Sequence, residues 1–411
     1  MSGHSTIASD DNTPVVPSSE PATKPLWLRI ATRTGAFLLE QWLLLAMGLV
    51  VLLAYFFPSV GKRGGYVVSE YTVTYGAVAI IFLCSGLTLP FDKLVKHARN
   101  IRLHIIVQLT SFLLTSAVFF GIACAAATSP DIETSNLVGF IATGALPTTI
   151  NSNVVMTRQA GGDVAATMVS VTLGNLLGPF ITPLLIAKLY LPSTKAFAQW
   201  LPEQALGHLP ELYRNVMFQM GLSVYVPLAV GQIVRAIWTK QVEHVVARYR
   251  LAKIGSFCLL ALIWSTFCTA FASKALQTLT PPTVAFNILT NLAVCVAFTG
   301  FAFLCARPPK RLAKLSPRAF RQVDKPEAIS ICFCAPAKTQ ALGIPLIAAM
   351  YTTADDKTRA LIQVPMILYT AEQILVGQVL VWLFKRWLRD DKEEDVETPG
   401  AVVEDDKRRP G

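Results

Sequence analysis

Long blocks of apolar residues are the feature of this sequence that most limits its fold. The blocks are roughly 20 residues long, the length at which an α-helix crosses about 30 Å of lipid hydrocarbon. Hydrophobic residues make up 53% of the 411 positions and charged residues only 15%, whereas a soluble domain carries about 25% charged residues. The sequence therefore predicts an all-α polytopic membrane protein.

The apolar pattern predicts ten transmembrane helices. Polar segments precede the first span and follow the last, so residues 1–35 and 389–411 are predicted to be disordered, and residues 36–388 to form one membrane domain. The predicted spans are 36–57, 71–90, 102–127, 136–157, 163–190, 212–237, 252–273, 283–306, 327–351 and 359–387.

Lysine and arginine are unevenly distributed between the predicted loops. The N-terminal segment, the even-numbered loops and the C-terminal tail hold 27 of the 36 such residues, and loop 307–325 alone carries seven. Because these residues are enriched on the cytoplasmic side of a membrane, both termini and the even-numbered loops are predicted to be cytoplasmic. Attraction to anionic inner-leaflet lipid accounts for this charge, so no nucleic-acid partner is predicted.

The positions of the cysteines and the absence of known catalytic motifs argue against several other classes of protein. All eight cysteines lie in or beside apolar spans, where a free cysteine behaves as a small hydrophobe. Cys332 and Cys334 lack the further Cys or His ligands of a closed metal site. The sequence contains no P-loop, HExxH or G-x-S-x-G motif. We therefore predict no disulfide framework, no metal site, no cofactor and no enzyme activity.

Two of the predicted spans contain prolines and polar residues at mid-depth. Span 4 contains "LPTTINSN" (146–153), which includes Asn151, Ser152 and Asn153. Span 9 contains "CAPAKTQALGIP" (334–345), and its polar residues are Lys338, Thr339 and Gln340. A proline removes a backbone donor, so both spans are predicted to unwind locally.

The two interruptions fall at the same place in each half of a five-plus-five arrangement. Paired broken helices of this kind indicate an inverted-repeat transporter with its binding site near the bilayer midplane. The alternative is a pair of proline kinks in a purely structural bundle. The polar residues around both breaks favour the site, because polar groups inside a membrane are usually functional.

Five segments carry a resemblance to a known family. They are "FLCSGLTLPFDKL" (82–94), "LPTTINSNVVMTRQAGGDVAATMVSVTLGNLLGPFITPLL" (146–185), "VPLAVGQIVR" (226–235), "CAPAKTQALGIPL" (334–346) and "VPMILYTAEQILVGQVLV" (364–381). In this order they resemble the bile acid:sodium symporter superfamily, and within it the sodium/bile acid cotransporter 7 group, which includes fungal regulators of calcium homeostasis. The resemblance implies a core domain (spans 3–5 and 8–10) that rocks against a panel domain (spans 1, 2, 6 and 7).

The same resemblance raises the question of whether this protein binds sodium as its sodium-coupled relatives do. In sodium-coupled members of the superfamily, spans 4, 5 and 9 supply sodium ligands, and here Ser152, Asn153 and Thr167 match ligands of spans 4 and 5. The bridging glutamate of span 9, however, falls at Cys334, and a nearby glutamine falls at Lys338. Hard cations require oxygen ligands and negative charge, so these replacements disfavour sodium. We predict that the Lys338 ammonium occupies the place of a cation, bound by carbonyls and hydroxyls freed at the crossing.

Span 10 adds a second ionisable residue at mid-depth, Glu372. By resemblance this part of span 10 faces the substrate cavity, and Tyr369, Thr370 and Gln373 are its candidate lining residues. Two arrangements are open for Glu372. It pairs with Lys338, or the cavity solvates each of the two residues separately.

Three functions follow from these observations and the resemblance. The first is a transporter-fold protein of the plasma membrane, or of secretory-pathway membranes, that restrains calcium entry by carrying a small solute or through a partner such as a calcium channel. The second is a symporter or antiporter for an organic anion, coupled to protons or sodium. The third is a regulator that keeps the fold but carries no solute.

The charge distribution makes a prediction about topology. Single cysteines introduced at positions 310–321 of an otherwise cysteine-free variant should react with a membrane-impermeant maleimide only after the cells are permeabilised, because the loop is predicted to be cytoplasmic. Labelling of these positions in intact cells would contradict the predicted orientation.

Overall fold

A computed structural model describes residues 42–89, 99–202, 209–309 and 321–397. The predicted disordered segment 1–35 lies outside these residues. The chain divides into two compact units, Met1–Leu45 and Ala46–Gly411. The first unit contributes to the described part only the start of helix α2 (Trp42–Phe56). Every regular element in the described residues is helical, as the sequence predicts.

Several long helices consist of consecutive elements joined without a break. In the first part of the chain, after the short helix α3 (Pro58–Gly61), these are α4 (Ser69–Tyr71), η1 (Thr72–Ala77) and α5 (Val78–Thr88), and then α7 (Ile101–Leu109), η2 (Thr110–Leu114) and α8 (Thr115–Ala126). Here η1 and η2 are π-helical turns. Such turns are uncommon within α-helices and occur frequently at functional sites.

The middle of the chain follows the same pattern. Its elements are α9 (Thr134–Ala145), α10 (Asn151–Gln159), α11 (Val164–Leu184), the π turn η3 (Leu185–Tyr190), the 3₁₀ turn η4 (Leu191–Ser193), α12 (Lys195–Ala198), α14 (Leu209–Met220), the π turn η5 (Gly221–Tyr225), α15 (Val226–Ile237) and α16 (Thr239–Tyr249). The remaining helices are α17 (Leu251–Ala272), α18 (Ala275–Thr278), α19 (Pro281–Ala306), α21 (Lys325–Cys334), α22 (Gln340–Met350) and α23 (Asp356–Glu397).

Seven helices in the described residues are long and apolar enough to cross a membrane. They are Ser69–Thr88, Ile101–Ala126, Val164–Ser193, Pro210–Ile237, Leu251–Ala272, Pro281–Ala306 and Asp356–Arg389, and Leu45–Phe56 and Gln340–Met350 are shorter apolar helices. Helices thus occur at every predicted span. The count of ten membrane crossings stays a prediction.

Spans 4 and 9 are interrupted where their prolines lie. Helix α9 ends at Ala145 and α10 begins at Asn151. Helix α21 ends at Cys334 and α22 begins at Gln340. The predicted local unwinding of both spans is therefore confirmed.

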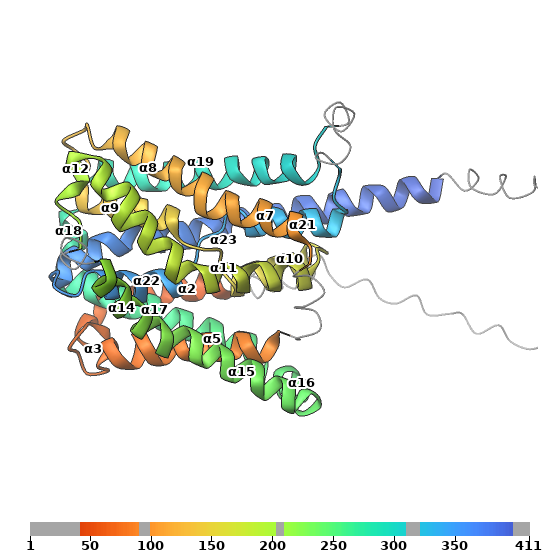
Figure 1. Ribbon diagram of the computed structural model, residues 1–411, viewed down its shortest axis with the longest axis horizontal. Coiled ribbons are helices and arrows are strands. Elements are labelled where there is room, and N and C mark those ends of the chain that lie inside the picture. The colour runs from red at the N-terminus through yellow and green to blue at the C-terminus, as the bar shows by residue number, and fades with distance from the viewer. Residues whose placement is uncertain (1–41, 90–98, 203–208, 310–320, 398–411) are drawn as a thin grey trace, which may run out of the picture. The chain divides into compact units, whose positions relative to one another are not determined.

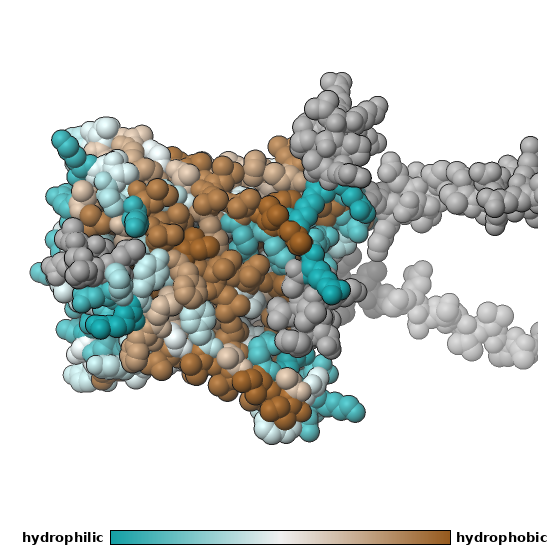
Figure 2. All heavy atoms as spheres, viewed as in Figure 1, coloured by the Kyte–Doolittle hydropathy of each residue, from teal (hydrophilic) through white to brown (hydrophobic). Residues whose placement is uncertain are grey.

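Large apolar side chains are exposed on the outside of the helices. Examples are Leu109 on α7, Leu289 and Val296 on α19, and Val379 and Trp382 on α23. Figure 2 shows hydrophobic residues spread over the middle of one face, with hydrophilic residues near its two ends. An apolar surface of this extent requires lipid rather than water around it.

Helix α23 extends further than the sequence analysis anticipates. It continues to Glu397, so residues 389–397 of the predicted disordered tail are helical. The three Glu, one Lys and one Arg of this segment have high helix propensity, and the segment continues an existing helix without a new nucleation step.

Helices α5, α15 and α17 form one packed group, and Figure 1 shows α16 turning away at the end of α15. Gly86 of α5 and Gly231 of α15 allow the two backbones to meet. A Cβ atom at Gly86 would lie 2.5 Å from the Leu228 oxygen, and one at Gly231 would lie 2.6 Å from the Leu83 oxygen. The close packing of α5 on α15 therefore depends on these two glycines.

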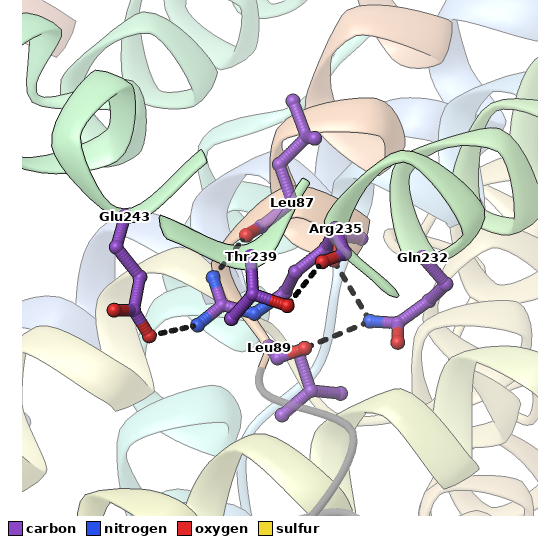
Figure 3. Close-up of polar contacts among 7 residues, drawn as sticks. Leu87, Leu89, Gln232, Arg235, Thr239 and Glu243 are labelled. Atoms are coloured by element: carbon purple, nitrogen blue, oxygen red, sulfur yellow. Dashed lines mark hydrogen bonds and ion pairs between the residues drawn. The ribbon is translucent and has the colours of Figure 1, made fainter. Parts of the chain in front are cut away.

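Polar side chains of α15 also bind the carbonyls at the end of α5 (Figure 3). Gln232 Nε2 donates to the oxygens of Gly86 (2.8 Å) and Leu89 (3.0 Å), and Arg235 Nη1 donates to the Leu87 oxygen (2.5 Å). Arg235 also pairs with Glu243 of α16 at 3.2 Å. These bonds satisfy carbonyls that the end of a helix leaves without intrahelical partners.

The helix contact makes a prediction about stability. Gly231→Ala should destabilise the protein by about 1–3 kcal/mol, because the added methyl group meets backbone atoms that cannot move independently. Gly300→Ala on α19 is the matched control, since open space surrounds Gly300, and alanine is the better helix former. Thermal unfolding in detergent measures both. A Gly231→Ala variant as stable as Gly300→Ala would contradict the proposed close contact.

Candidate functional site

The two interrupted helices meet at their breaks. The Thr339 backbone N–H, at the start of α22, donates to the Pro147 oxygen between α9 and α10 at 2.9 Å. The bond satisfies groups that the helix interruptions free. The structure thus brings together the two segments that the sequence analysis singles out.

Lys338 lies in the middle of this crossing, with only 1% of its surface exposed. Its ammonium donates to the Ser111 oxygen (2.6 Å), the Ser111 hydroxyl (3.2 Å) and the Leu146 oxygen (3.0 Å). These three acceptors match the three donors of an ammonium group. The protonated form of Lys338 is therefore bound by neutral oxygens alone, in the manner of a bound cation.

Both carbonyl acceptors come from irregular backbone. Leu146 directly follows the last residue of α9, where carbonyls lack intrahelical partners and the helix dipole is negative. Ser111 lies in the π turn η2, where the regular α-helical hydrogen-bond pattern is interrupted. The break in span 4 and the π turn in span 3 therefore supply the acceptors of the buried ammonium.

Helix α23 holds the backbone on either side of the lysine. Gln373 Oε1 accepts from the Lys338 backbone N–H at 2.8 Å, and Gln373 Nε2 donates to the Lys338 oxygen at 2.9 Å. The Tyr369 hydroxyl donates to the Pro336 oxygen at 2.6 Å. Tyr369 and Gln373, predicted to line the substrate cavity, both bind unwound backbone, and their predicted role toward a substrate stays a prediction. The Thr370 hydroxyl bonds to Met366 in its own helix.

The residues that match sodium ligands also gather beside the crossing. Asn153 Nδ2 donates to the Thr148 hydroxyl at 2.9 Å, and the Thr167 hydroxyl donates to Thr157 at 3.1 Å. The Cys334 thiol lies against both Asn153 and Thr167. The Ser152 hydroxyl is buried and has no hydrogen-bond partner among the described residues. The Asn151 side chain lies outside the described part.

Glu372 lies apart from the Lys338 ammonium, whereas Gln340 lies buried at the break of span 9, where the sequence places it. The acceptors of the Lys338 ammonium are Ser111 and Leu146, and Glu372 is not among them. The two residues are therefore not paired, and Lys338 is bound by protein oxygens rather than solvated. Glu372 faces Asn291 of α19. Both side-chain polar atoms of Gln340 are buried without a partner in the described residues.

A cavity of about 240 Å³ is lined by α4, η1, α14 and α17 together with α22 and α23. Its polar lining includes Arg63, Glu70, Gln219, Arg359 and Gln363. Arg359 Nη2 pairs with Asp356 at 3.0 Å, whereas its Nε and Nη1 atoms are buried without a partner in the described part of the chain.

The sequence analysis did not single out these cavity residues. Gln219 and Gln363 are buried polar residues within apolar helices. Polar residues inside membrane spans are usually functional, so the reasoning that identified Lys338 could also have identified these two residues. The assembly of Arg63 and Arg359 at one cavity depends on tertiary structure and has no signal in the sequence.

Comparison with known proteins establishes the family. Residues 41–386 match the model of the SBF-like CPA transporter family (DUF4137). The chain belongs to this family. It is 36% identical over 394 residues to Solute carrier RCH1 of Candida albicans, covering 91% of this chain and 95% of that protein. It is also 36% identical over 394 residues to Solute carrier RCH1 of Saccharomyces cerevisiae, covering 90% and 89%.

A more distant relative is Sodium/bile acid cotransporter 7-B of Xenopus laevis. The identity is 29% over 349 residues, which cover 85% of this chain and 93% of the frog protein. The resemblance stated from the sequence motifs is confirmed. This member of the SBF-like family is an integral membrane protein.

The crossing in this family member fits an internal ammonium better than a sodium ion. Sodium is a hard cation that favours several oxygen ligands and negative charge. At this crossing the Cys334 thiol stands where the resemblance places a carboxylate, and Lys338 already supplies a positive charge. A sodium ion beside the ammonium would add repulsion between like charges in a region of low dielectric.

Substitution of Lys338 tests this view of the crossing. Lys338→Ala should lower stability, because each buried acceptor left without a donor costs about 1–3 kcal/mol. Sodium should partly restore the stability of Lys338→Ala or Lys338→Gln, whereas wild type should be equally stable in sodium chloride and choline chloride. Lys338→Gln should not bind sodium fully, because Cys334 lacks a carboxylate.

The measurement is thermal unfolding in detergent in both salts. Lys240→Ala, which changes an exposed lysine of α16, is the control. Specific stabilisation of wild type by sodium, or a Lys338→Ala variant as stable as Lys240→Ala, would contradict the internal-cation role.

Proposed function

We propose that this protein is a carrier that moves a small solute without a sodium ion at its helix crossing. The observation that carries the proposal is the Lys338 ammonium, which is bound by two backbone carbonyls and one hydroxyl between the two broken helices. A tethered ammonium stabilises the crossing permanently, so the crossing does not depend on a dissociable ion.

The proposed architecture is a ten-span, five-plus-five inverted repeat that works by alternating access. A core domain of spans 3–5 and 8–10 would rock against a panel domain of spans 1, 2, 6 and 7. The packing of α5 against both α15 and α17 supports a separate panel group. The cavity of about 240 Å³ supports a pathway, since both groups of helices line it.

The size and lining of the cavity favour a small polar solute. Drug-sized ligands occupy pockets of roughly 300–1,000 Å³, and this cavity measures about 240 Å³. Ser69, Thr74 and Thr266 add hydroxyl groups to its lining. A second candidate function is the symport or antiport of an organic anion coupled to protons or sodium. The two buried Arg359 nitrogens without a partner in the described residues favour this candidate, because they can donate to a carboxylate.

We further propose that carriage of this solute restrains calcium entry into the cell. The support is the resemblance to the fungal calcium-homeostasis branch, together with the similarity to two fungal proteins named Solute carrier RCH1. The proposed location is the plasma membrane, with secretory-pathway membranes as the alternative and with both termini cytoplasmic. A non-transporting role, exerted on a calcium channel or its regulators, is the third candidate.

A variant in which a large side chain fills the cavity distinguishes solute transport from a purely regulatory role. Deletion of the protein in its native cells should increase calcium uptake after a stimulus, and re-expressed wild type should reverse this. Ala348→Trp should fail to reverse it at equal abundance, because Ala348 lines the cavity and an indole ring fills much of that space. Cytosolic calcium recordings measure the response.

Val379→Trp, on the exposed apolar surface of α23, is the matched control and should behave as wild type. If Ala348→Trp restores restraint fully, the non-transporting role is favoured over carriage. Unchanged calcium transients in the deletion would remove the calcium role and leave the anion carrier as the leading candidate.

A further inference from the structure

Helix α19 carries a regular row of polar residues on one buried face. The row repeats every fourth position and consists of Thr283, Asn287, Asn291, Cys295 and Thr299. All five are at least nine-tenths buried. Residues four apart lie on the same side of an α-helix, so the row forms a polar stripe along the helix between its neighbours.

One end of the stripe reaches the protein surface. The Thr283 hydroxyl donates to the Asp131 oxygen at 3.3 Å and accepts from the Glu133 backbone N–H at 3.2 Å. Asp131 is exposed. One turn further along, Asn287 Nδ2 donates to Asn136 Oδ1 of α9 at 2.6 Å. The stripe therefore begins at the loop that precedes α9 and continues inward along α9.

At Asn291 the stripe reaches Glu372 of α23. Glu372 is 7% exposed and interacts with Asn291. Several buried polar atoms along the path have no hydrogen-bond partner among the described residues: Asn136 Nδ2, Asn287 Oδ1, both amide atoms of Asn291, and Glu372 Oε2. Buried polar atoms nearly always have partners, and ordered water supplies them where protein does not.

We propose that the section of this stripe from Thr283 to Asn291 is a hydrated proton path and that Glu372, paired with Asn291, is the proton-binding site at its inner end. A hydronium ion of the water chain transfers its proton to one carboxylate oxygen: an O–H bond of the hydronium breaks, an O–H bond on the carboxyl forms, and neutral water remains. The neutral carboxyl then donates to Asn291 Oδ1, while Asn291 Nδ2 donates to the second carboxyl oxygen. Protonation thereby supplies the donor that Asn291 Oδ1 needs, since an ionised carboxylate only accepts hydrogen bonds.

The surrounding groups favour a proton over a metal ion. Hard cations bind about six or more oxygen ligands, and no group of three His, Cys, Asp or Glu side chains in the described chain is placed to hold a metal. The titratable groups that interact with Glu372 are Cys295 of α19 and Tyr369 of α23. The Tyr369 hydroxyl is engaged by the Pro336 oxygen.

Other charged groups lie away from the carboxyl. Helices α9, α18 and α22, which pack against α23, contain no titratable side chain. Helices α10, α17 and α21 carry their charged residues in terminal turns, namely Arg158, Lys253, Lys325 and Glu327. The other titratable residues of these three helices are Cys258, Cys268, Cys332 and Cys334. The Lys338 ammonium is directed to Ser111 and Leu146.

The inference deepens the proposed carrier function, since it supplies a proton for coupling, but it is tested without any solute. Infrared spectroscopy of the purified protein in detergent at neutral pH should show the band of a protonated carboxyl. The band should disappear in Glu372→Gln and persist in Glu211→Gln, which makes the same change at an exposed site on α14. Asn291→Leu should shift the band to higher frequency, because the carboxyl loses its partner.

The proton path has its own measurement, the rate at which the band shifts after transfer to D₂O. Asn287→Leu should slow this exchange by about tenfold or more, because ordered water is lost where its polar partners are removed. Thr299→Val, on the far side of Cys295, should leave the rate unchanged.

Absence of the wild-type band at neutral pH, or its persistence in Glu372→Gln, would overturn the proton site. An exchange rate in Asn287→Leu that is no slower than in wild type or in Thr299→Val would overturn the path. The wild-type spectrum requires no variant, so the proton site is tested even if a variant does not fold. Failure of the carrier function in cells would leave both measurements valid.

Discussion

The bond between one buried ammonium and the backbone of two other helices is the interaction on which the rest of this site depends. Lys338 joins the break of span 9 to the Leu146 oxygen at the break of span 4 and to the Ser111 oxygen in the π turn of span 3. An unpaired lysine at this depth would cost several kcal/mol. With three acceptors in place, the same charge holds three irregular stretches of backbone together.

The irregular backbone and the lysine depend on each other. Prolines free carbonyls that a membrane interior cannot solvate, and the ammonium satisfies the carbonyl that ends α9. Gln373 and Tyr369 of α23 bind the unwound strand on either side of Lys338. These hydrogen bonds connect α23 to the crossing. Glu372, which precedes Gln373 in the same helix, faces α19. Substrate pathway and proton site would then share one rigid framework.

The sequence predicted the breaks, the lysine and the approximate helices because each depends on local chemistry. Apolar length, proline positions and a charge in an apolar run can all be read without tertiary structure. The partners of Lys338 could not be predicted, since Ser111 becomes available through a π turn that has no sequence signature. Glu372 was singled out, but its partner was not: Asn291 belongs to a polar row that repeats every fourth residue in the sequence, and only the packing of α19 against α23 brings that row to Glu372.

The most direct test of the central claim is an experimental density map of the crossing, determined in sodium at a resolution that separates side-chain ends from ions. The account predicts that Lys338 Nζ lies within hydrogen-bond distance of the Ser111 and Leu146 oxygens and that no ion density lies beside it. An ion coordinated by Ser152, Asn153 or Thr167, with Lys338 turned out of the crossing, would contradict the account.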